Sequence, residues 1–318
     1  MDKKTVLKYI PHGIDSKKFY PIEEGITPNF PEENKRLEEI KSQIFKNINP
    51  EFIVLYNNRN IRRKQASNTI LAFNLFISKL PVEKADKCVL LLHTQPIDDN
   101  GTDLIAVSST LAPRAKILFS SGKVDFKDLN CLYNIADVTI NMANAEGFGL
   151  STAESIMAGT PIMATVTGGL QDQMNFSDDT GKPIIFTEDW GSNSDGKHKI
   201  NYGEWAFPLF PKARSLTGSP LTPYILDDYS DWEEAADILM KIYNMPKEER
   251  KRRGKSGRTW MILPETGMEM IEMADRFIKG IDETFKSWSP RKKYEIFKVE
   301  NDTEIRPTGV SLTNFNEI

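Results

Sequence analysis

The sequence predicts an α/β protein with a doubly wound, Rossmann-like parallel sheet, because two features recur along its first 170 residues. Short apolar, β-branched runs alternate with segments in which apolar residues recur at helical spacing. Polar loops follow several of these runs, where parallel sheets place their ligand sites. With 318 residues, 39% of them hydrophobic, the chain is long enough for one large or two modest domains with a substantial core.

The expected elements follow one another in a regular order. We predict helices at 32–48, 68–80, 103–112, 125–136 and 151–158, and strands at 51–56, 88–93, 116–120, 137–141 and 161–166. The rhythm breaks at 174–226, a stretch with Trp190, Trp205 and little periodicity, which predicts an irregular insertion that covers a cleft or binds a partner. Amphipathic helices are expected at 231–244 and 268–288, and the methionine-rich stripe of the second is predicted to be core.

Composition and charge exclude several classes of function. A net charge of -4 and a pI near 5.6 give no reason to expect nucleic-acid binding. The basic run at 248–258 is expected to be a solvated helix end. Cys88 and Cys131 both lie in apolar runs and are predicted to be buried thiols of a reducing compartment. Without a signal peptide or a membrane-spanning run, a cytoplasmic protein is expected, and peripheral membrane contact stays open.

The loop at 143–150 is the first candidate site. It leads from a predicted strand into a predicted helix, for which Ser151 or Thr152 is the expected N-cap. Gly147 and Gly149 would let the backbone approach a ligand closely, and the N–H groups of the first helical turn favour an anion such as a phosphate.

Two carboxylates flank this loop. Carboxylates accept hydrogen bonds from hydroxyl groups, so Glu154 suits a ribose and Glu146 suits a sugar ring. From the spacing alone, Glu154 could equally be a first-turn capping residue and Glu146 a solvated charge. Arg59 and Lys64, in the loop after the first strand, offer a guanidinium fork and a mobile ammonium for phosphate oxygens, or form a solvated basic turn.

A longer signature links these residues. Glu146-x7-Glu154 with Gly-Phe-Gly-Leu between, then Glu154-Ser-x-x-Ala158-Gly159-x-Pro161 and Thr167-Gly168-Gly169-Leu170, resembles the donor-binding signature of retaining glycosyltransferases of family 4, which have the GT-B fold. The resemblance implies that Glu146 contacts the donor sugar, that Glu154 binds the ribose, and that Arg59 and Lys64 clamp the diphosphate. It implies further donor-binding residues: Gly147, Phe148, Gly149, Leu150, Ser151, Thr152, Gly122, Val124, Gly168 and Gly169.

One position departs from the family pattern, because the glycine that usually follows the lysine is Gln65 here. The segment Pro11-His12-Gly13-Ile14-Asp15 resembles the interdomain connection of the same enzymes, so His12 and Gly13 are candidates for the cleft, although a structural role for His12 stays open. The resemblance thus divides the chain into a linker-like segment (1–24), a donor-binding domain (25–228), C-terminal helices that pack on it (229–290) and a tail (291–318). The acceptor-binding half of such an enzyme is not evident.

The implied activity is transfer of a sugar from a nucleotide-diphosphate sugar to an unknown glycan, lipid or protein acceptor, with retention of configuration. Glu146, Arg59 and Lys64 would be the catalytic residues, with no cofactor and no metal. Asp98 and Asp99 are adjacent, which favours a surface turn over a cation site. Other interpretations stay open. The chain could be a non-catalytic nucleotide-sugar-binding module, or a donor subunit whose partner is a separate acceptor-domain chain or a second copy of itself. It could also be a nucleotide-sugar epimerase or hydrolase.

Overall fold

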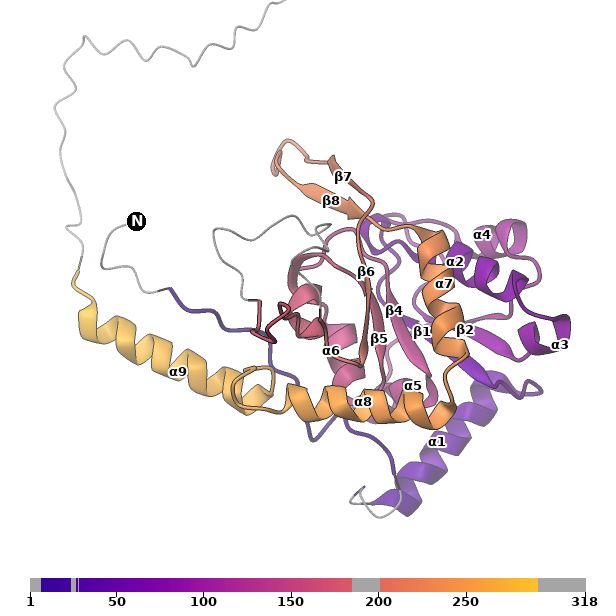
Figure 1. Ribbon diagram of the computed structural model, residues 1–318, viewed down its shortest axis with the longest axis horizontal. Coiled ribbons are helices and arrows are strands. Elements are labelled where there is room, and N and C mark those ends of the chain that lie inside the picture. Colours follow the sequence, from indigo (N-terminus) through magenta and orange to yellow (C-terminus); the bar gives the residue numbers. More distant parts are fainter. Residues whose placement is uncertain (1–6, 24–26, 28, 185–200, 291–318) are drawn as a thin grey trace, which may run out of the picture.

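A computed structural model describes residues 7–23, 27, 29–184 and 201–290. Their central element is a six-stranded parallel sheet with the strand order β3-β2-β1-β4-β5-β6, the order of dinucleotide-binding domains. Helices flank the sheet (Figure 1). The strands are β1 (Phe52–Asn57), β2 (Cys88–His93), β3 (Ile117–Ser120), β4 (Val138–Asn141), β5 (Ile162–Thr165) and β6 (Ala206–Leu209). The predicted fold class is therefore confirmed.

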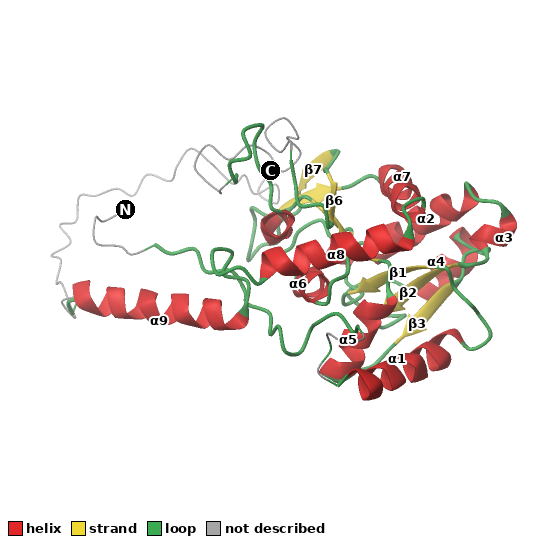
Figure 2. Ribbon diagram, turned by 60° about the horizontal axis from the view of Figure 1, so that its bottom comes forward, coloured by secondary structure: helices red, strands yellow, loops and turns green. Residues whose placement is uncertain are grey.

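Alternate residues of the strands fill two separate cores. Val54 and Tyr56 belong to one core and Ile53 and Leu55 to the other, so β1 is apolar along its whole length. The first core is closed by α2 (Ala66–Ser78), α4 (Leu104–Leu111) and α7 (Trp232–Tyr243). The second is closed by α1 (Phe30–Phe45), α5 (Phe126–Ile135), α6 (Leu150–Met157) and α8 (Lys247–Met261), and Figure 2 shows α8 crossing in front of the sheet. Shorter elements are α3 (Val82–Ala85), η1 (Arg62–Lys64) and η2 (Gly168–Met174).

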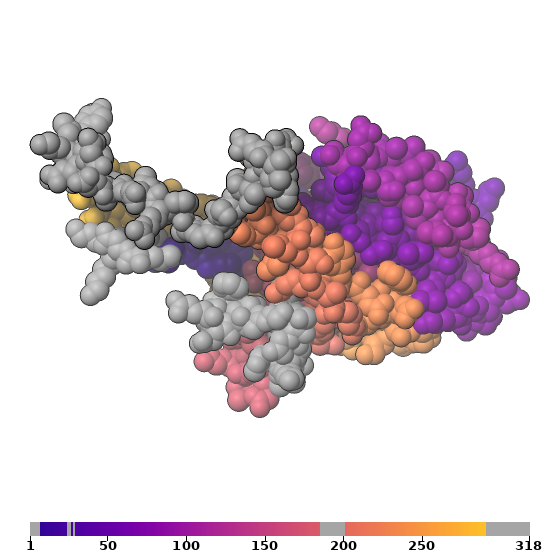
Figure 3. All heavy atoms as spheres, turned by 90° about the horizontal axis from the view of Figure 1, so that it is seen from above, coloured from indigo at the N-terminus to yellow at the C-terminus, as the bar shows by residue number. Residues whose placement is uncertain are grey.

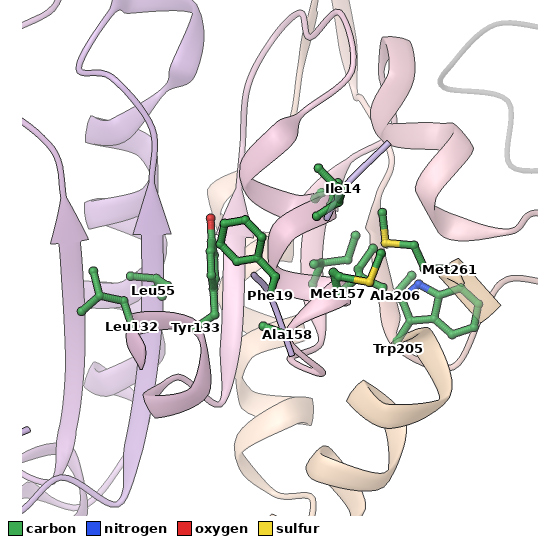
Figure 4. Packing of buried hydrophobic residues seen from close by; sticks show 14 of the residues in the cluster. Ile14, Phe19, Leu55, Leu132, Tyr133, Met157, Ala158, Trp205, Ala206 and Met261 are labelled. Atoms are coloured by element: carbon green, nitrogen blue, oxygen red, sulfur yellow. The ribbon is translucent and has the colours of Figure 1, made fainter. Parts of the chain in front are cut away.

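Glycines let α8 approach the second core closely. A Cβ on Gly257 would lie 2.6 Å from Cγ of Trp205, and a Cβ on Gly254 would overlap the backbone at Gly159. Figure 4 shows Trp205 and Met261 beside Met157, with Phe19 against Tyr133 further along the same layer. The N-terminal segment thus takes part in this core through Phe19, which is buried.

The prediction that the basic run at 248–258 is solvated is wrong for two of its arginines. Arg250 is buried, and its guanidinium lies 3.0 Å from Oδ1 of Asp137, whose side chain is 10% exposed. Arg258 donates to the backbone carbonyls of Phe19, at 2.7 Å, and of Met157. These arginines join α8 to the sheet and to the N-terminal segment.

The segment predicted to be irregular contributes a strand to the sheet. β6 pairs in parallel with β5, and an antiparallel hairpin of β7 (Ala213–Leu216) and β8 (Leu226–Tyr229) follows it. β6 is a four-residue edge strand containing Pro208, so its sequence lacks a strong strand pattern. Trp190 and its neighbours at 185–200 lie outside the described residues, as do residues 1–6 of the linker-like segment and the tail at 291–318.

The last described helix, α9 (Met270–Ser287), projects away from the sheet (Figures 1 and 2). The prediction that its apolar stripe is core is wrong, since no residue of α9 is buried. Five of its apolar side chains are between 50% and 71% exposed: Ile271, Phe277, Ile278, Ile281 and Phe285. At its start the N–H of Gly13 donates to Sδ of Met273 at 3.1 Å, and near its end Glu283 pairs with Lys8 at 2.7 Å. None of the described helices is long and apolar enough to cross a membrane.

Candidate functional site

The loop between β4 and α6 is shaped by glycines. Gly149 caps α6 with a φ of +91°, a conformation that favours glycine, so the expected cap at Ser151 or Thr152 is wrong. Thr152 instead donates from Oγ1 to the carbonyl of Gly149 at 2.8 Å. A Cβ on Gly169 would lie 2.6 Å from Cα of Phe148, and one on Gly168 would overlap the carbonyl of Glu146. Positions 168 and 169 therefore have to be glycine for the loop to pack against η2.

Gln173 of η2 fixes the loop from the other side. Its Nε2 donates to the carbonyls of Phe148, at 2.6 Å, and Gly149, at 3.1 Å. By contrast, a Cβ on Gly147 would meet no atom within 4 Å among the described residues. The loop is thus packed on its inner side and open at Gly147.

The loop borders a cavity of about 420 Å³, which we call the α6 cavity. It lies where β1 ends and α6 begins. Its lining residues are His12, Asn57, Asn58, Lys64, Glu146, Phe148, Gly149, Leu150, Ser151 and Glu154. The Oγ of Ser151 is buried and has no hydrogen-bond partner among the described residues, so a polar donor or acceptor is available to a ligand there.

Lys64 and Glu146 form a buried ion pair at this cavity, with side chains 9% and 10% exposed. The ammonium also donates to Oδ1 of Asn58 at 2.9 Å. Burial lowers the pKa of Lys64, and the Glu146 carboxylate opposes that shift. Arg63 lies 3.6 Å from the same carboxylate and donates to the carbonyl of Ala145 at 2.7 Å. Two cations therefore hold Glu146 in place.

Glu154 is held by a chain of hydrogen bonds from the sheet. The Tyr133 hydroxyl donates to Oε2 of Glu154 at 2.7 Å, and Nδ2 of Asn57 donates to the Tyr133 hydroxyl at 2.7 Å. Burial raises the pKa of Glu154, and the hydrogen bond from Tyr133 opposes the shift. The roles of Asn57 and Tyr133 are not evident from the sequence, because the two residues lie on different elements and no local spacing links them.

A second cavity, of about 570 Å³, lies between the Glu146 loop and the β7–β8 hairpin, and we call it the hairpin cavity. Glu146 lines both cavities. The hairpin is joined to the loop by the buried Asp228, whose N–H donates to the carbonyl of Asn144 at 2.8 Å. Its carboxylate accepts from Oγ1 of Thr167 at 2.7 Å and from Nε of Arg214 at 2.8 Å. Arg214 and Asp228 are not evident from the sequence, because the hairpin that pairs them begins within the segment 174–226, where no periodicity predicts a fold.

Comparison with known proteins gives this arrangement a family context. Residues 38–181 match the family model described as "Glycosyl transferases group 1". These residues form a glycosyl transferases group 1 domain. A mannosylfructose-phosphate synthase of Agrobacterium fabrum is 24% identical over 231 residues, which are 67% of this chain and 45% of that protein. The uncharacterized glycosyltransferase MJ1607 of Methanocaldococcus jannaschii is 24% identical over 200 residues, 55% of this chain and 45% of that protein.

Solved structures share the fold of the group 1 domain. Sucrose-phosphate synthase from Thermosynechococcus elongatus superposes with a TM-score of 0.56 at 20% identity. The matched region is 88% of this chain and 53% of the synthase chain. Anabaena Alr3699/HepE, solved in complex with UDP and glucose, has a TM-score of 0.56 at 13% identity, with 86% and 56% covered. The chain spans about half the length of these proteins and of the two curated relatives.

The structure brings together some of the residues singled out from the sequence and leaves others apart. Lys64, Glu146, Glu154 and His12 line one cavity, and the His12 ring lies 5.2 Å from that of Phe148. Arg59 does not line this cavity, because its guanidinium pairs with Asp98 at 2.9 Å.

Several other predicted positions do not line the α6 cavity: Gly147 and Gly168 line the hairpin cavity, and Thr152 and Gly169 line neither. Gly13 packs on the start of α9. Gly122, with a φ of +100°, and Val124 follow β3 at the same edge of the sheet and do not line the cavity. Gln65 adopts a φ of +53°, the left-handed conformation that would suit the glycine usual in the resembled family. Within the described ranges, no group of three or more His, Cys, Asp or Glu side chains is placed to hold a metal ion.

Proposed function

We propose that this chain binds a nucleotide-diphosphate sugar in the α6 cavity and transfers the sugar to an acceptor with retention of configuration. The observation that supports the proposal best is the convergence of an ammonium, two carboxylates and a helix N-terminus on one cavity. The unpaired N–H groups of the first turn of α6 suit the diphosphate, Glu154 suits the ribose hydroxyls and Glu146 suits the sugar. The Anabaena structure with UDP and glucose supports the same donor class.

The proposed reaction needs no metal. The bond between the anomeric carbon and the diphosphate oxygen breaks, the bond to the acceptor oxygen forms on the same face, and the acceptor proton passes to the departing phosphate oxygen. The N-terminus of α6 and the Lys64 ammonium stabilise the negative charge that develops on the diphosphate. Arg59 would have to leave Asp98 to assist, whereas Arg63 already lies beside Glu146.

A donor subunit that works with a separate acceptor-domain chain is a second candidate. The exposed apolar face of α9 favours it, because an amphipathic helix normally buries such a face against another surface. A non-catalytic binding module would share the donor cavity and differ only in turnover.

A panel of UDP-, GDP- and ADP-sugars tests the proposal. We expect one nucleoside diphosphate to bind the chain, and its sugar to be hydrolysed slowly, with both properties weakened in Lys64→Ala. Hydrolysis of one donor supports a catalytic chain, whereas tight nucleotide binding without turnover supports the binding module. If none of the three nucleotides binds, the proposed function is wrong.

A further inference from the structure

The β7–β8 hairpin carries an apolar strip that begins at the candidate site. It follows β6 after three residues, so it stands at the edge of the parallel sheet where the strands end, and Figure 1 shows it projecting from there. Figure 3 looks down on this side and shows the orange hairpin region beside the purple residues of the N-terminal half. Cross-strand partners in the hairpin are Arg214 with Asp228 and Leu216 with Leu226.

The register determines where this strip points. Side chains two positions apart in a strand share a face, so Leu226 lies on the same face as Asp228, two cross-strand pairs further out. Asp228 is buried against Thr167, so that face is turned toward the Glu146 loop. Ile225 and Leu226 line the hairpin cavity, and the apolar surface continues outward over Leu216 and Tyr224, which are 65% and 87% exposed.

The inner end of the hairpin cavity is polar and carries charges of both signs. It is lined by two basic residues, Arg63 and Arg214, and by the acidic Glu146 and Asp228, whereas the register turns the side chain of Asp227 to the other face of β8. This balance provides no net attraction for a phosphate dianion. It suits a group with several hydroxyls, because each hydroxyl can donate to a carboxylate and accept from a guanidinium.

We propose that the hairpin cavity is the acceptor subsite of this chain and that the acceptor is a glycolipid, with its sugar at Glu146 and its hydrocarbon chain along Leu226, Leu216 and Tyr224. This inference rests on the proposed function, since Glu146 lines both cavities and a hydroxyl in the hairpin cavity would face a donor sugar in the α6 cavity. That hydroxyl oxygen forms the new bond to the anomeric carbon, the bond to the diphosphate breaks, and the diphosphate takes the hydroxyl proton.

Alkyl glucosides below their micellar concentrations test the subsite by calorimetry on the full chain. Hexyl and octyl β-glucoside differ by two methylenes, and for a half-exposed groove we expect octyl glucoside to bind about fourfold more tightly. The double variant Leu216→Thr/Leu226→Thr should abolish this difference. Both side chains are more than half exposed and threonine favours strands, so its unfolding temperature should match that of the parent chain. Val82→Thr, a similar change at an exposed site on α3, is the matched control.

Each outcome decides a different point. Equal binding of the two glucosides, or an unchanged difference in the double variant, overturns the inference. Tighter binding of octyl phosphate than of octyl glucoside overturns the assignment of a sugar head group. A double variant that alters only the oligomeric state shows that the hairpin docks protein instead, which also overturns it. Nucleoside diphosphate binding is measured in parallel: if it is absent while the chain-length effect holds, the proposed function fails and the amphiphile site stands.

Discussion

Replacing Glu154 with glutamine separates the role of this residue in binding from its role in stability. The carboxylate is partly buried and accepts a hydrogen bond from Tyr133, and burial raises its pKa. A carboxylate whose pKa is raised on folding destabilises the folded chain above that pKa, and the cost disappears as the pH falls through it. Glutamine is neutral throughout and can still accept from Tyr133. We therefore expect Glu154→Gln to be as stable as the parent chain or about 1 kcal/mol more stable at pH 8, with the difference shrinking at pH 5.

Binding should change in the opposite direction. A hydrogen bond to a charged acceptor contributes about 1.5–3 kcal/mol, and glutamine weakens the bonds that the ribose hydroxyls would donate. The loss corresponds to a dissociation constant roughly tenfold to a hundredfold higher for the preferred nucleoside diphosphate. Inorganic pyrophosphate, which has no ribose, should bind the parent chain and Glu154→Gln equally. Lys64→Met should weaken the binding of both ligands, because we propose that its ammonium contacts the phosphates.

Calorimetry with UDP, GDP, ADP and pyrophosphate, together with thermal unfolding at pH 5 and pH 8, measures these effects. Tyr133→Phe should be measured beside Glu154→Gln, because it removes the hydroxyl that bonds both Nδ2 of Asn57 and Oε2 of Glu154. It should lower both stability and nucleotide affinity. The reasoning is refuted if Glu154→Gln binds every nucleotide as the parent chain does, or if it weakens pyrophosphate as much as the nucleotide.

Three further outcomes are expected. Gly147→Ala should leave the unfolding temperature unchanged, because its Cβ would meet open space. Gly169→Ala should destabilise the fold by about 1–3 kcal/mol, because its Cβ would overlap the Glu146 loop, and equal losses of stability in denaturant unfolding would contradict this. Arg250→Met removes the cation beside Asp137, and burial already raises the pKa of that carboxyl group. Denaturant unfolding should therefore show a loss of stability of about 3–5 kcal/mol at pH 7.5, which is partly recovered near pH 5.5 as the carboxyl group protonates. A loss that does not depend on pH would count against the ion pair. Burial raises the pKa of the Cys88 thiol to about 12 and that of the Cys131 thiol to about 11. Iodoacetamide at pH 8 should therefore modify both thiols only in denaturant, and rapid labelling of the native chain would disprove their burial.

The sequence predicts the strands that are buried on both faces, because burial makes them continuously apolar. Residues 88–93 are a clear example, whereas β6 is short, lies at an edge and contains Pro208. Long-range contacts follow from the order of the strands. β1 and β4 are neighbours, which brings Lys64 and Glu146 together across 82 residues of sequence.

Side-chain partners are harder to predict than backbone positions. Arg59 has the spacing expected of a phosphate ligand, yet Asp98 from the loop after β2 holds it in an exposed ion pair. Gln65 shows the converse: the side chain departs from the family pattern while the backbone keeps a positive φ. A non-glycine residue in this conformation costs about 1–2 kcal/mol, so the surrounding contacts of η1 and α2 must impose it.

The two mistaken burial predictions have one physical cause. Helical periodicity identifies which residues of a helix share a face, but the surface that covers this face is a property of the assembled fold. In α8 the basic residues suggest solvent, yet Gly254 and Gly257 allow an approach close enough to bury Arg250 against Asp137. In α9 the stripe is strongly apolar, yet the helix leaves the domain at Met270 and none of its residues is buried. Since so large an apolar face is unfavourable in water, α9 is the surface on which we expect a second polypeptide to bind, whereas the sugar chemistry is expected in the α6 cavity, which His12 lines.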